Sequence, residues 1–270
     1  MPSQRHDSAL RDLLLDASLH AARRGAEYVR ERTRDLARID WQVKSRADFV
    51  SDVDLGAETR IADYLLERVP EALVLGEELT PLAATNDGIV FVVDPLDGTT
   101  NFLHGFPEYA VSIGALAGGT LAAAVVVQIP LDVTYHATEG GGAFRDGERL
   151  RVSSTDDPLR ALIGTGFPFK EPDQIEPYLA QLGRVMTEVA GVRRPGSAAL
   201  DLAHVAEGSF DAFWEQMLSP WDIAAGILLV REAGGRVTDY GGRDITAAHT
   251  PVVASNRRLH EWLLERLAAS

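Results

Sequence analysis

The chain has 270 residues, of which 46% are hydrophobic and 24% are charged, and its formal net charge is −14. This length and balance are typical of a globular protein with a large buried core, and the acidic charge argues against a nucleic-acid-binding surface, which is usually basic. The chain contains no cysteine, which excludes disulfides, thiolate nucleophiles and cysteine-ligated zinc. It shows neither the pattern of a secretory signal nor an apolar run of membrane-spanning length, so we expect a cytoplasmic protein that does not contact membranes.

The N-terminal part predicts two helices and one short strand. Apolar residues recur at helical spacing over residues 7–34, which indicates an amphipathic packing helix. A polar connector leads to a second helix, which Asp54 is well placed to cap. Residues 72–78 then predict a strand that ends in Glu77 and Glu78. Helix capping and a solvated strand end are the purely structural interpretations of these acids.

The most informative stretch is Asp-Pro-Leu-Asp-Gly-Thr-Thr-Asn-Phe at residues 94–102. It follows an apolar, β-branched run at residues 89–93, which predicts a buried strand. The strand delivers Asp94 and Asp97 into a tight turn, where Gly98 lets a ligand approach the backbone closely. Carboxylate oxygens suit a hard cation and free backbone N–H groups suit an anion, so this turn indicates a site that handles phosphate with a metal. An acidic turn without a ligand is the alternative.

The middle of the chain predicts a run of antiparallel strands. Two strands, at residues 109–117 and 120–128, are joined at Gly118-Gly119, which is a hairpin signal, and a further strand follows at 133–138. The glycines at 140–142 lack the spacing of a nucleotide-binding loop and predict a turn. Residues 155–158 look like a boundary between two halves of the chain.

The second half alternates strands and helices, which is an α/β pattern. The predicted elements are, in order, a strand at 162–165, a helix at 174–190, a helix from Gly196-Ser197-Ala198 to residue 207, a strand over 211–215 that ends at Glu215, a helix at 223–230 preceded by Asp222, strands at 236–239 and 252–255, and a helix at 259–268. A helix N-terminus can receive the polar part of a ligand, and Asp222 is placed to interact favourably with a helix dipole.

Three motifs together resemble the inositol monophosphatase family, a group of magnesium-dependent, lithium-sensitive phosphatases. They are Gly-Glu-Glu at 76–78, the stretch at 94–102, and Trp-Asp-Ile-Ala-Ala-Gly at 221–226 with Glu-Ala-Gly-Gly at 232–235. The segment 48–54 is similar to a fourth family pattern that ends in an acid. The resemblance implies a mixed α/β fold, a layered α/β/α/β/α sandwich also seen in fructose-1,6-bisphosphatases. It implies one domain over residues 1–270, with sub-layers at about 1–155 and 156–270.

The resemblance also implies a set of site residues. The implied ligands of two or three Mg²⁺ ions are Glu77, Asp94, the backbone carbonyl of Leu96, Asp97 and Asp222. The implied catalytic residues, which take or orient the proton of an attacking water, are Glu77, Thr99 and Asp54. The implied substrate-binding residues are Asp97, Gly98, Thr99, Gly196, Ser197, Ala198, Glu215 and Asp222. Lys44 resembles a basic residue near the family's metal site, although its spacing to Asp48 is one residue shorter than expected.

The sequence fits two other classes of function less well. A phospho-aspartyl phosphatase uses an acid two residues after its nucleophilic aspartate, whereas Asp97 lies three residues after Asp94. A non-catalytic regulatory or scaffold protein with this fold would be expected to lack one of the metal carboxylates, and none is missing.

The segments 165–170 and 194–202 look most like bacterial inositol-1-monophosphatases. We therefore expect hydrolysis of a small phosphomonoester, inositol 1-phosphate first, to myo-inositol and phosphate by attack of a metal-activated water. Histidinol phosphate, fructose 1,6-bisphosphate and nucleotide 3′-phosphates are the alternative substrates. A homodimer is expected by analogy with the family.

Overall fold

The computed structural model describes residues 2–34, 39, 41–45, 48–79, 88–248 and 250–268, with side chains described for all of these except 2–7 and 44–49. The side chains of Lys44 and Asp48 therefore lie outside the described part, and their roles stay predictions. Within the described residues, no helix is long and apolar enough to span a membrane.

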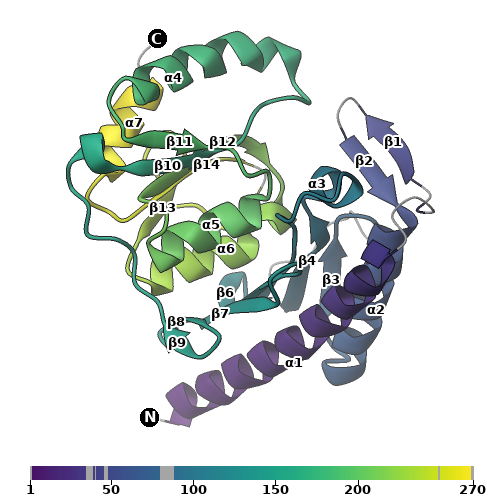
Figure 1. Cartoon of the computed structure of the whole chain (residues 1–270). Helices are drawn as coiled ribbons and strands as arrows, with labels where there is room; N and C mark the ends of the chain where they lie inside the picture. The colour runs from purple at the N-terminus through teal and green to yellow at the C-terminus, as the bar shows by residue number, and fades with distance from the viewer. Residues whose placement is uncertain are drawn as a thin grey trace.

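A seven-stranded sheet forms the larger half of the structure (Figure 1). Its strand order is β3-β4-β5-β6-β7-β8-β9, with β3 parallel to β4 and every later pair antiparallel. The strands are β3 (Leu73–Gly76), β4 (Ile89–Asp97), β5 (Ala110–Ala117), β6 (Thr120–Gln128), β7 (Val133–Thr138), β8 (Gly142–Arg145) and β9 (Glu148–Arg149). The hairpin predicted at Gly118-Gly119 is confirmed as the β5–β6 connection.

A five-stranded sheet forms the other half, with the order β11-β10-β12-β14-β13. Its strands are β10 (Leu162–Thr165), β11 (Gly191–Arg193), β12 (Ala212–Leu218), β13 (Arg236–Thr238) and β14 (Thr250–Ser255). β10 is parallel to both β11 and β12, and β14 is antiparallel to both of its neighbours. A separate hairpin consists of β1 (Trp41–Ser45) and β2 (Asp48–Ser51).

Helices cover the outer faces of both sheets and fill the space between them (Figure 1). The helices are α1 (Pro2–Arg32), α2 (Asp52–Arg68), α3 (Thr99–Leu103), α4 (Ile175–Met186), α5 (Ala198–Glu207), α6 (Pro220–Glu232) and α7 (His260–Ala268), with short 3₁₀ turns at Pro158–Arg160 and Pro172–Gln174. The large sheet packs against α1 and α2 on one side, α5 and α6 lie between the sheets, and α4 and α7 pack on the far side of the small sheet. The predicted α/β/α/β/α layering is confirmed.

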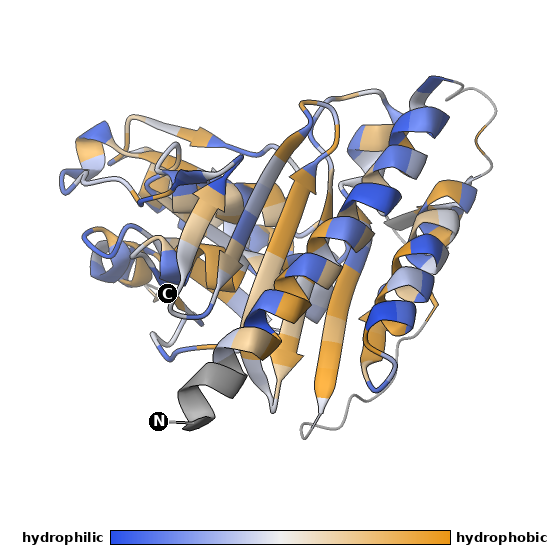
Figure 2. Cartoon of the chain, turned by 90° about the horizontal axis from the view of Figure 1, so that it is seen from below, coloured by the Kyte–Doolittle hydropathy of each residue, from blue (hydrophilic) through white to orange (hydrophobic). Residues whose placement is uncertain are grey.

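The pattern of β4 explains why it sits at the centre of these layers. Val90 and Val92 belong to the core shared with α5 and α6, whereas Phe91 and Val93 belong to the core shared with α1 and α2. Successive side chains of a strand point to opposite faces, so a strand covered on both faces must be apolar throughout. Figure 2 shows this as mostly hydrophobic strands beside an outer helix, α1, whose exposed turns are hydrophilic.

Several predicted boundaries need correction, and three of them bear on the site. Ser51, not Asp54, is the N-cap of α2: the Ser51 hydroxyl accepts from the N–H groups of Val53 and Asp54, and Asp54 is the third helical residue of a capping box. β12 continues beyond Glu215 to Leu218, because its pairing with β14 resumes after an irregularity. α6 begins before Asp222, because Ser219 is its N-cap.

Candidate active site

The end of β4 turns two carboxylates toward the same side of the sheet. Asp94 pairs with Ser112 and Asp97 pairs with Ala110, so three steps along β4 correspond to two along β5. In a regular strand, residues three apart would face opposite sides, and a bulge restores them to the same side. Asp94 and Asp97 accordingly line one hollow of about 400 Å³.

Asp94 lies at the bottom of this hollow. It is 1% exposed, and its Oδ1 accepts the Leu96 N–H at 3.0 Å. Burial raises the pKa of Asp94 well above its ordinary value, and the neighbouring charges of Glu77, Asp97 and Asp222 raise it further. Carboxylates from the end of β3, from β4 and from α6 therefore repel one another at one place.

Thr99 is held by two acceptors on either side of the turn. Its hydroxyl lies 2.9 Å from Asp54 Oδ1 and 3.0 Å from the Leu96 carbonyl oxygen, so its single proton can serve either acceptor. The other oxygen of Asp54 accepts from the N–H of Ser51 at 2.8 Å and from its hydroxyl at 2.5 Å. Burial raises the pKa of Asp54, and these hydrogen bonds oppose that rise. Asp54 lies behind the hollow and contacts it through Thr99.

Glu58 is a site residue that the sequence analysis did not identify. This fully buried acid of α2 accepts the N–H groups of Glu78 at 2.7 Å and Leu79 at 2.9 Å, and so fixes the segment that carries Glu77. A Cβ at Gly76 would come within 2.0 Å of Glu58 Oε1, so glycine leaves room for the acid. The available signal was an acid on the apolar side of a predicted helix.

Asp97 connects the end of β4 to the start of α5. Its Oδ2 accepts the Ser197 hydroxyl at 2.6 Å and the Ala199 N–H at 2.7 Å. Burial raises the pKa of Asp97 to about 6, even though hydrogen bonds from Ser197, Ala199 and Ala198 lower it. The predicted helix start at Gly196-Ser197-Ala198 is confirmed, and this acid from the other sheet supplies its cap.

Glu215 and Asp222 form the opposite wall of the site. Burial raises the pKa of Glu215 to about 8, while the charge of Arg194 lowers it. A Cβ at Gly166 would lie 1.8 Å from the Glu215 carboxyl carbon, so Gly166 is needed for the present position of this acid. Asp222 Oδ2 accepts the Ser219 N–H at 2.6 Å, which fixes it at the first turn of α6.

Two adjoining hollows, of about 400 and 420 Å³, hold most of the predicted site residues. Both share a set of lining residues, namely Glu77, Asp97, Asp222, Phe169, Lys170, Arg194 and Gly196. The first, which we call the carboxylate hollow, is lined in addition by Asp94, Leu96, Gly98, Thr99 and Thr100. The second, which we call the outer hollow, is lined in addition by Ala198, Glu215, Phe167, Met217 and Trp221. Of the predicted residues, Asp54 and Ser197 line neither hollow but bond to residues that do.

The donor set of the carboxylate hollow fits a hard divalent cation in its chemistry. Four carboxylates and the Leu96 backbone line it, and such oxygens are the ligands that Mg²⁺ and similar ions prefer. A cation would relieve the repulsion that raises the pKa of Asp94 and of Asp222. Among the described residues no three Asp, Glu or His side chains already have a metal-holding arrangement, so binding would draw these groups together.

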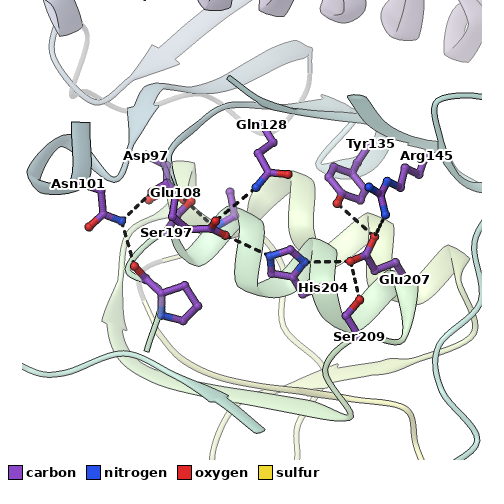
Figure 3. A network of polar contacts seen from close by, with 12 residues as sticks. Asp97, Asn101, Glu108, Gln128, Tyr135, Arg145, Ser197, His204, Glu207 and Ser209 are labelled. Carbon is purple, nitrogen blue, oxygen red and sulfur yellow. Dashed lines mark hydrogen bonds and ion pairs between the residues drawn. The ribbon is translucent and has the colours of Figure 1, made fainter. Parts of the chain in front are cut away.

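A chain of ion pairs lies beside the site and was not predicted (Figure 3). His204 of α5 contacts Glu108 through Nε2 at 3.1 Å and Glu207 through Nδ1 at 3.0 Å. Glu207 also accepts from Arg145 of β8 at 2.9 Å, so the chain joins the large sheet to α5. Burial lowers the pKa of His204, but the hydrogen bonds and charges of Glu108 and Glu207 outweigh it and raise the pKa to about 9.

Asn101 links the segment that contains Glu108 to the loop that precedes α5. Its Nδ2 donates to the carbonyl oxygens of Glu108 at 2.6 Å and of Pro195 at 3.0 Å, as Figure 3 shows. The turn after β4 and the loop before α5 are therefore held together independently of Asp97.

Comparison with known proteins identifies relatives of the whole chain. The sequence model of the inositol monophosphatase family matches residues 11–270. The inositol-1-monophosphatase of Rhizobium meliloti is 41% identical over 94% of this chain and 96% of that protein, and the Nus factor SuhB of Pseudomonas aeruginosa is 41% identical over 93% and 94%. The crystal structure of the extragenic suppressor protein suhB of Bartonella henselae has a TM-score of 0.91 at 38% identity, and covers 95% of this chain and 99% of that one. The chain therefore belongs to the inositol monophosphatase family, whose members are generally metal-dependent phosphatases.

Proposed function

We propose that this chain is a Mg²⁺-dependent phosphomonoester hydrolase that converts inositol 1-phosphate to myo-inositol and phosphate. The observation that supports this most directly is the gathering of Glu77, Asp94, Asp97 and Asp222 around one hollow, beside the turn at Gly98. Four acids at one place are costly unless a cation binds there, and a cation in turn attracts a phosphate to an acidic protein.

The acids of the carboxylate hollow are the groups that would hold the metal ions. We assign Glu77, Asp94, Asp97, Asp222 and the carbonyl of Leu96 as the groups that hold two or three Mg²⁺ ions. When bound, these ions supply a Lewis acid for the phosphate and lower the pKa of an attacking water. Inhibition by Li⁺ is expected from the family resemblance.

Protein groups receive the proton that the water loses as it attacks phosphorus. Thr99 is bonded to Asp54 at 2.9 Å, so it can take a proton from the water as it passes its own to Asp54. Burial raises the pKa of Asp54, which favours its accepting that proton. Glu77 lines the same hollow and is the other candidate acceptor. The bond from phosphorus to the alcohol oxygen breaks in the same displacement, and that oxygen takes up a proton from solvent water to leave as the alcohol.

The alcohol of the substrate would lie in the outer hollow. Gly196, Ala198 and Glu215 line it, and each can accept or donate hydrogen bonds to hydroxyl groups. Ser197 acts through Asp97, to which it donates a hydrogen bond of 2.6 Å. A polyol such as inositol has the hydroxyl groups that this wall can bind.

Phosphate release from four substrates tests this proposal. Inositol 1-phosphate, histidinol phosphate, fructose 1,6-bisphosphate and 3′-phosphoadenosine 5′-phosphate would be compared with Mg²⁺, with a chelator and with added Li⁺. We expect Mg²⁺-dependent, Li⁺-inhibited release that is fastest with inositol 1-phosphate. The Asp94→Asn variant should lose this activity, whereas Asp12→Asn, a substitution on the exposed side of α1, should keep it.

Two outcomes would contradict the proposal. Release that persists under exhaustive chelation would exclude the metal mechanism. No release from any of the four substrates would exclude the inositol assignment and favour a non-catalytic role for this fold. The second outcome matters because a relative of equal identity is named a Nus factor. The complete set of four carboxylates supports catalysis in this chain.

A further inference from the structure

We propose that Met217 is a specificity-determining residue whose side chain contacts the C–H face of the substrate's ring, so that cyclic alcohols are preferred to open-chain ones. The inference rests on the proposed phosphatase function and names a residue that selects the alcohol at the same site. Its evidence is the unusual backbone of Met217, the exposure of its side chain, and the mixed polar and apolar lining of the outer hollow.

Met217 has a backbone conformation that residues other than glycine rarely adopt. Its φ is +59°, and the other described non-glycine residues with positive φ are Asp132, Asp146 and Arg257. These three line neither hollow, whereas Met217 lines the outer one. The left-handed region is unfavourable for a residue with a Cβ, so glycine would fit this position with less strain. Strain that is kept at the edge of a site points to a role of the side chain.

Pairing with β14 fixes the chain on both sides of Met217. Glu215 pairs with Val252 and Leu218 pairs with Thr250, so three steps along β12 correspond to two along β14. Met217 lies within this bulge, and bulges near active sites redirect side chains. The backbone around Met217 is therefore set by the sheet, and the side chain lines the outer hollow together with Glu215.

The side chain of Met217 is only partly covered by the protein. It is 48% exposed, whereas the other apolar residues of β12 are buried, namely Ala212, Phe213, Trp214 and Leu218. An apolar side chain at the edge of a hollow gains free energy when a ligand removes its surface from water. The thioether of methionine is flexible and polarizable, so it adapts to the shape of that ligand.

The outer hollow has both charged and apolar lining. The charged lining has both signs and includes Lys170, Glu171, Arg194 and Glu215. The apolar lining includes large side chains that solvent can reach, namely Phe167, Phe169, Met217 and Trp221. Hydroxyl groups can donate to the acids and accept from the cations, so neutral polar groups suit the charged lining. A ligand that fills the hollow therefore needs hydroxyl groups and an apolar surface together.

A cyclic polyol matches this combination. Its hydroxyl groups project from the edge of the ring, whereas the faces of the ring carry C–H bonds, which are apolar. Hydroxyl groups at Glu215 and Ala198 would leave one face of the ring toward Met217 in the same hollow. An open-chain alcohol such as glycerol has no such face and rotates about its single bonds. It therefore buries less apolar area and loses more conformational entropy on binding.

Phosphate release from inositol 1-phosphate and glycerol 2-phosphate tests the inference, because both carry the phosphate on a secondary carbon. Both would be measured with Mg²⁺ for the wild-type chain, Met217→Ala and Met217→Leu. Met186→Ala is the matched control, because Met186 is an exposed methionine of α4 that lines neither hollow.

We expect the wild-type chain to prefer inositol 1-phosphate in kcat/KM. Met217→Ala should lower kcat/KM for inositol 1-phosphate about 4-fold, mainly through KM, as for the loss of one buried methylene, and should change glycerol 2-phosphate less than about 1.5-fold. Met217→Leu keeps an apolar side chain and should retain most of the preference. Met186→Ala should behave as the wild type with both substrates.

Met217→Gly separates the backbone strain from the contact with the substrate. Glycine adopts a φ of +59° without a Cβ, so this variant should unfold at a higher urea concentration than Met217→Ala. It should nevertheless show the same reduced preference for inositol 1-phosphate, because both variants lack the thioether. A variant that regains the preference would show that the backbone of residue 217, and not its side chain, selects the alcohol.

Three further outcomes would overturn the inference. An equal loss for both substrates in Met217→Ala would mean that Met217 supports the reacting phosphate or the fold. An unchanged preference in Met217→Ala would exclude the contact, and so would a wild-type chain without preference. If neither substrate is hydrolysed, the proposed function fails, and calorimetric binding of inositol 1-phosphate with Mg²⁺ still decides the contact. Weaker binding to Met217→Ala than to the wild type would then support it, and equal or absent binding would exclude it.

Discussion

Asp97 and Ala199 are joined by a hydrogen bond of 2.7 Å across 102 residues of sequence. The acceptor is a carboxylate at the end of β4, and the donor is a backbone N–H in the first turn of α5. A residue proposed to hold the metal is thus also the cap of the helix whose start lines the alcohol side. The proposed metal ligand and the wall proposed to bind the alcohol are therefore positioned by one shared contact.

Asp97→Asn should affect both activity and helix stability. The amide cannot serve as an anionic ligand, so we expect at least a 100-fold loss of kcat, in the range of a lost electrostatic contribution. Ser197→Ala removes only the 2.6 Å hydrogen bond to Asp97 and should cost about 1 kcal/mol of stability with a much smaller loss of activity. Steady-state kinetics and urea unfolding of both variants check this. Equal kinetic losses would show that Asp97 acts only through the helix.

Gly76→Ala should disturb the segment that carries Glu77. The added Cβ would come within 2.0 Å of Glu58, which is fully buried and cannot move without breaking its bonds to the N–H groups of Glu78 and Leu79. We expect a loss of about 1–3 kcal/mol in the free energy of unfolding, together with a higher Mg²⁺ concentration for half-maximal activity.

Gly183→Ala is the matched control for Gly76→Ala. A Cβ at Gly183, in the middle of α4, would meet no atom within 4 Å. Because alanine favours a helix over glycine, this variant should be as stable as the wild type or more stable by up to about 1 kcal/mol. Urea unfolding measures the stability of both variants, and Mg²⁺ titration of activity measures their Mg²⁺ requirement. A normal Mg²⁺ requirement in Gly76→Ala would disprove the role assigned to Glu58.

Thr99→Val should slow the chemical step. Valine keeps the shape but removes the hydroxyl that bonds to Asp54 at 2.9 Å, so we expect kcat to fall about 100-fold with little change in KM. Thr99→Ser keeps the hydroxyl and should retain most of the activity. Thr120→Val, at an exposed residue of β6 that lines neither hollow, should behave as the wild type. A Thr99→Val variant with normal kcat would leave Glu77 as the remaining candidate proton acceptor.

The two contacts of His204, with Glu108 and Glu207, should make the folded chain less stable as the pH becomes alkaline. The pKa of His204 is raised from 6.5 to about 9 by Glu108 and Glu207, so the charged form stabilises the fold fully below pH 6.5 and this contribution is lost as pH rises through 9. The rise corresponds to about 3 kcal/mol at most. Asp201 also lies near His204; burial raises the pKa of Asp201 well above its ordinary value, and the charge of His204 only partly opposes that rise.

Urea unfolding between pH 6 and pH 9.5 measures this dependence. His204→Gln should be less stable than the wild type at pH 6, and the difference should shrink toward pH 9.5. His20→Gln, in an exposed contact with Asp16 on α1, should leave the pH profile as it is in the wild type. A constant difference between His204→Gln and wild type across this range would show that His204 is not charged in the folded chain.

The local pattern of the sequence was sufficient for most strands of the two sheets, the β5–β6 hairpin and the main motifs, but it missed the β1–β2 hairpin and strands β8, β9 and β11. The run at 89–93 had to be a strand buried on both faces, because it is apolar at every position. Turn residues after it placed Asp94 and Asp97 together, and helix spacing located α2, α5 and α6. These features depend on residues a few positions apart, so no knowledge of the tertiary structure was needed. The boundary errors at Asp54 and Glu215 have a different origin. Helix caps and strand pairing depend on specific hydrogen-bond partners, which the local pattern does not identify.

Only the tertiary structure decided which distant groups meet. Glu58 bonds to residues 20 and 21 positions away, Asp97 caps a helix from the other half of the chain, and His204 pairs with Glu108, 96 positions away. Such contacts depend on the packing of whole layers, and sequence spacing carries no information about them. The sequence by itself thus determined the fold class and the acids of the site. The packing of β4 between two helical layers determined which groups hold those acids in place.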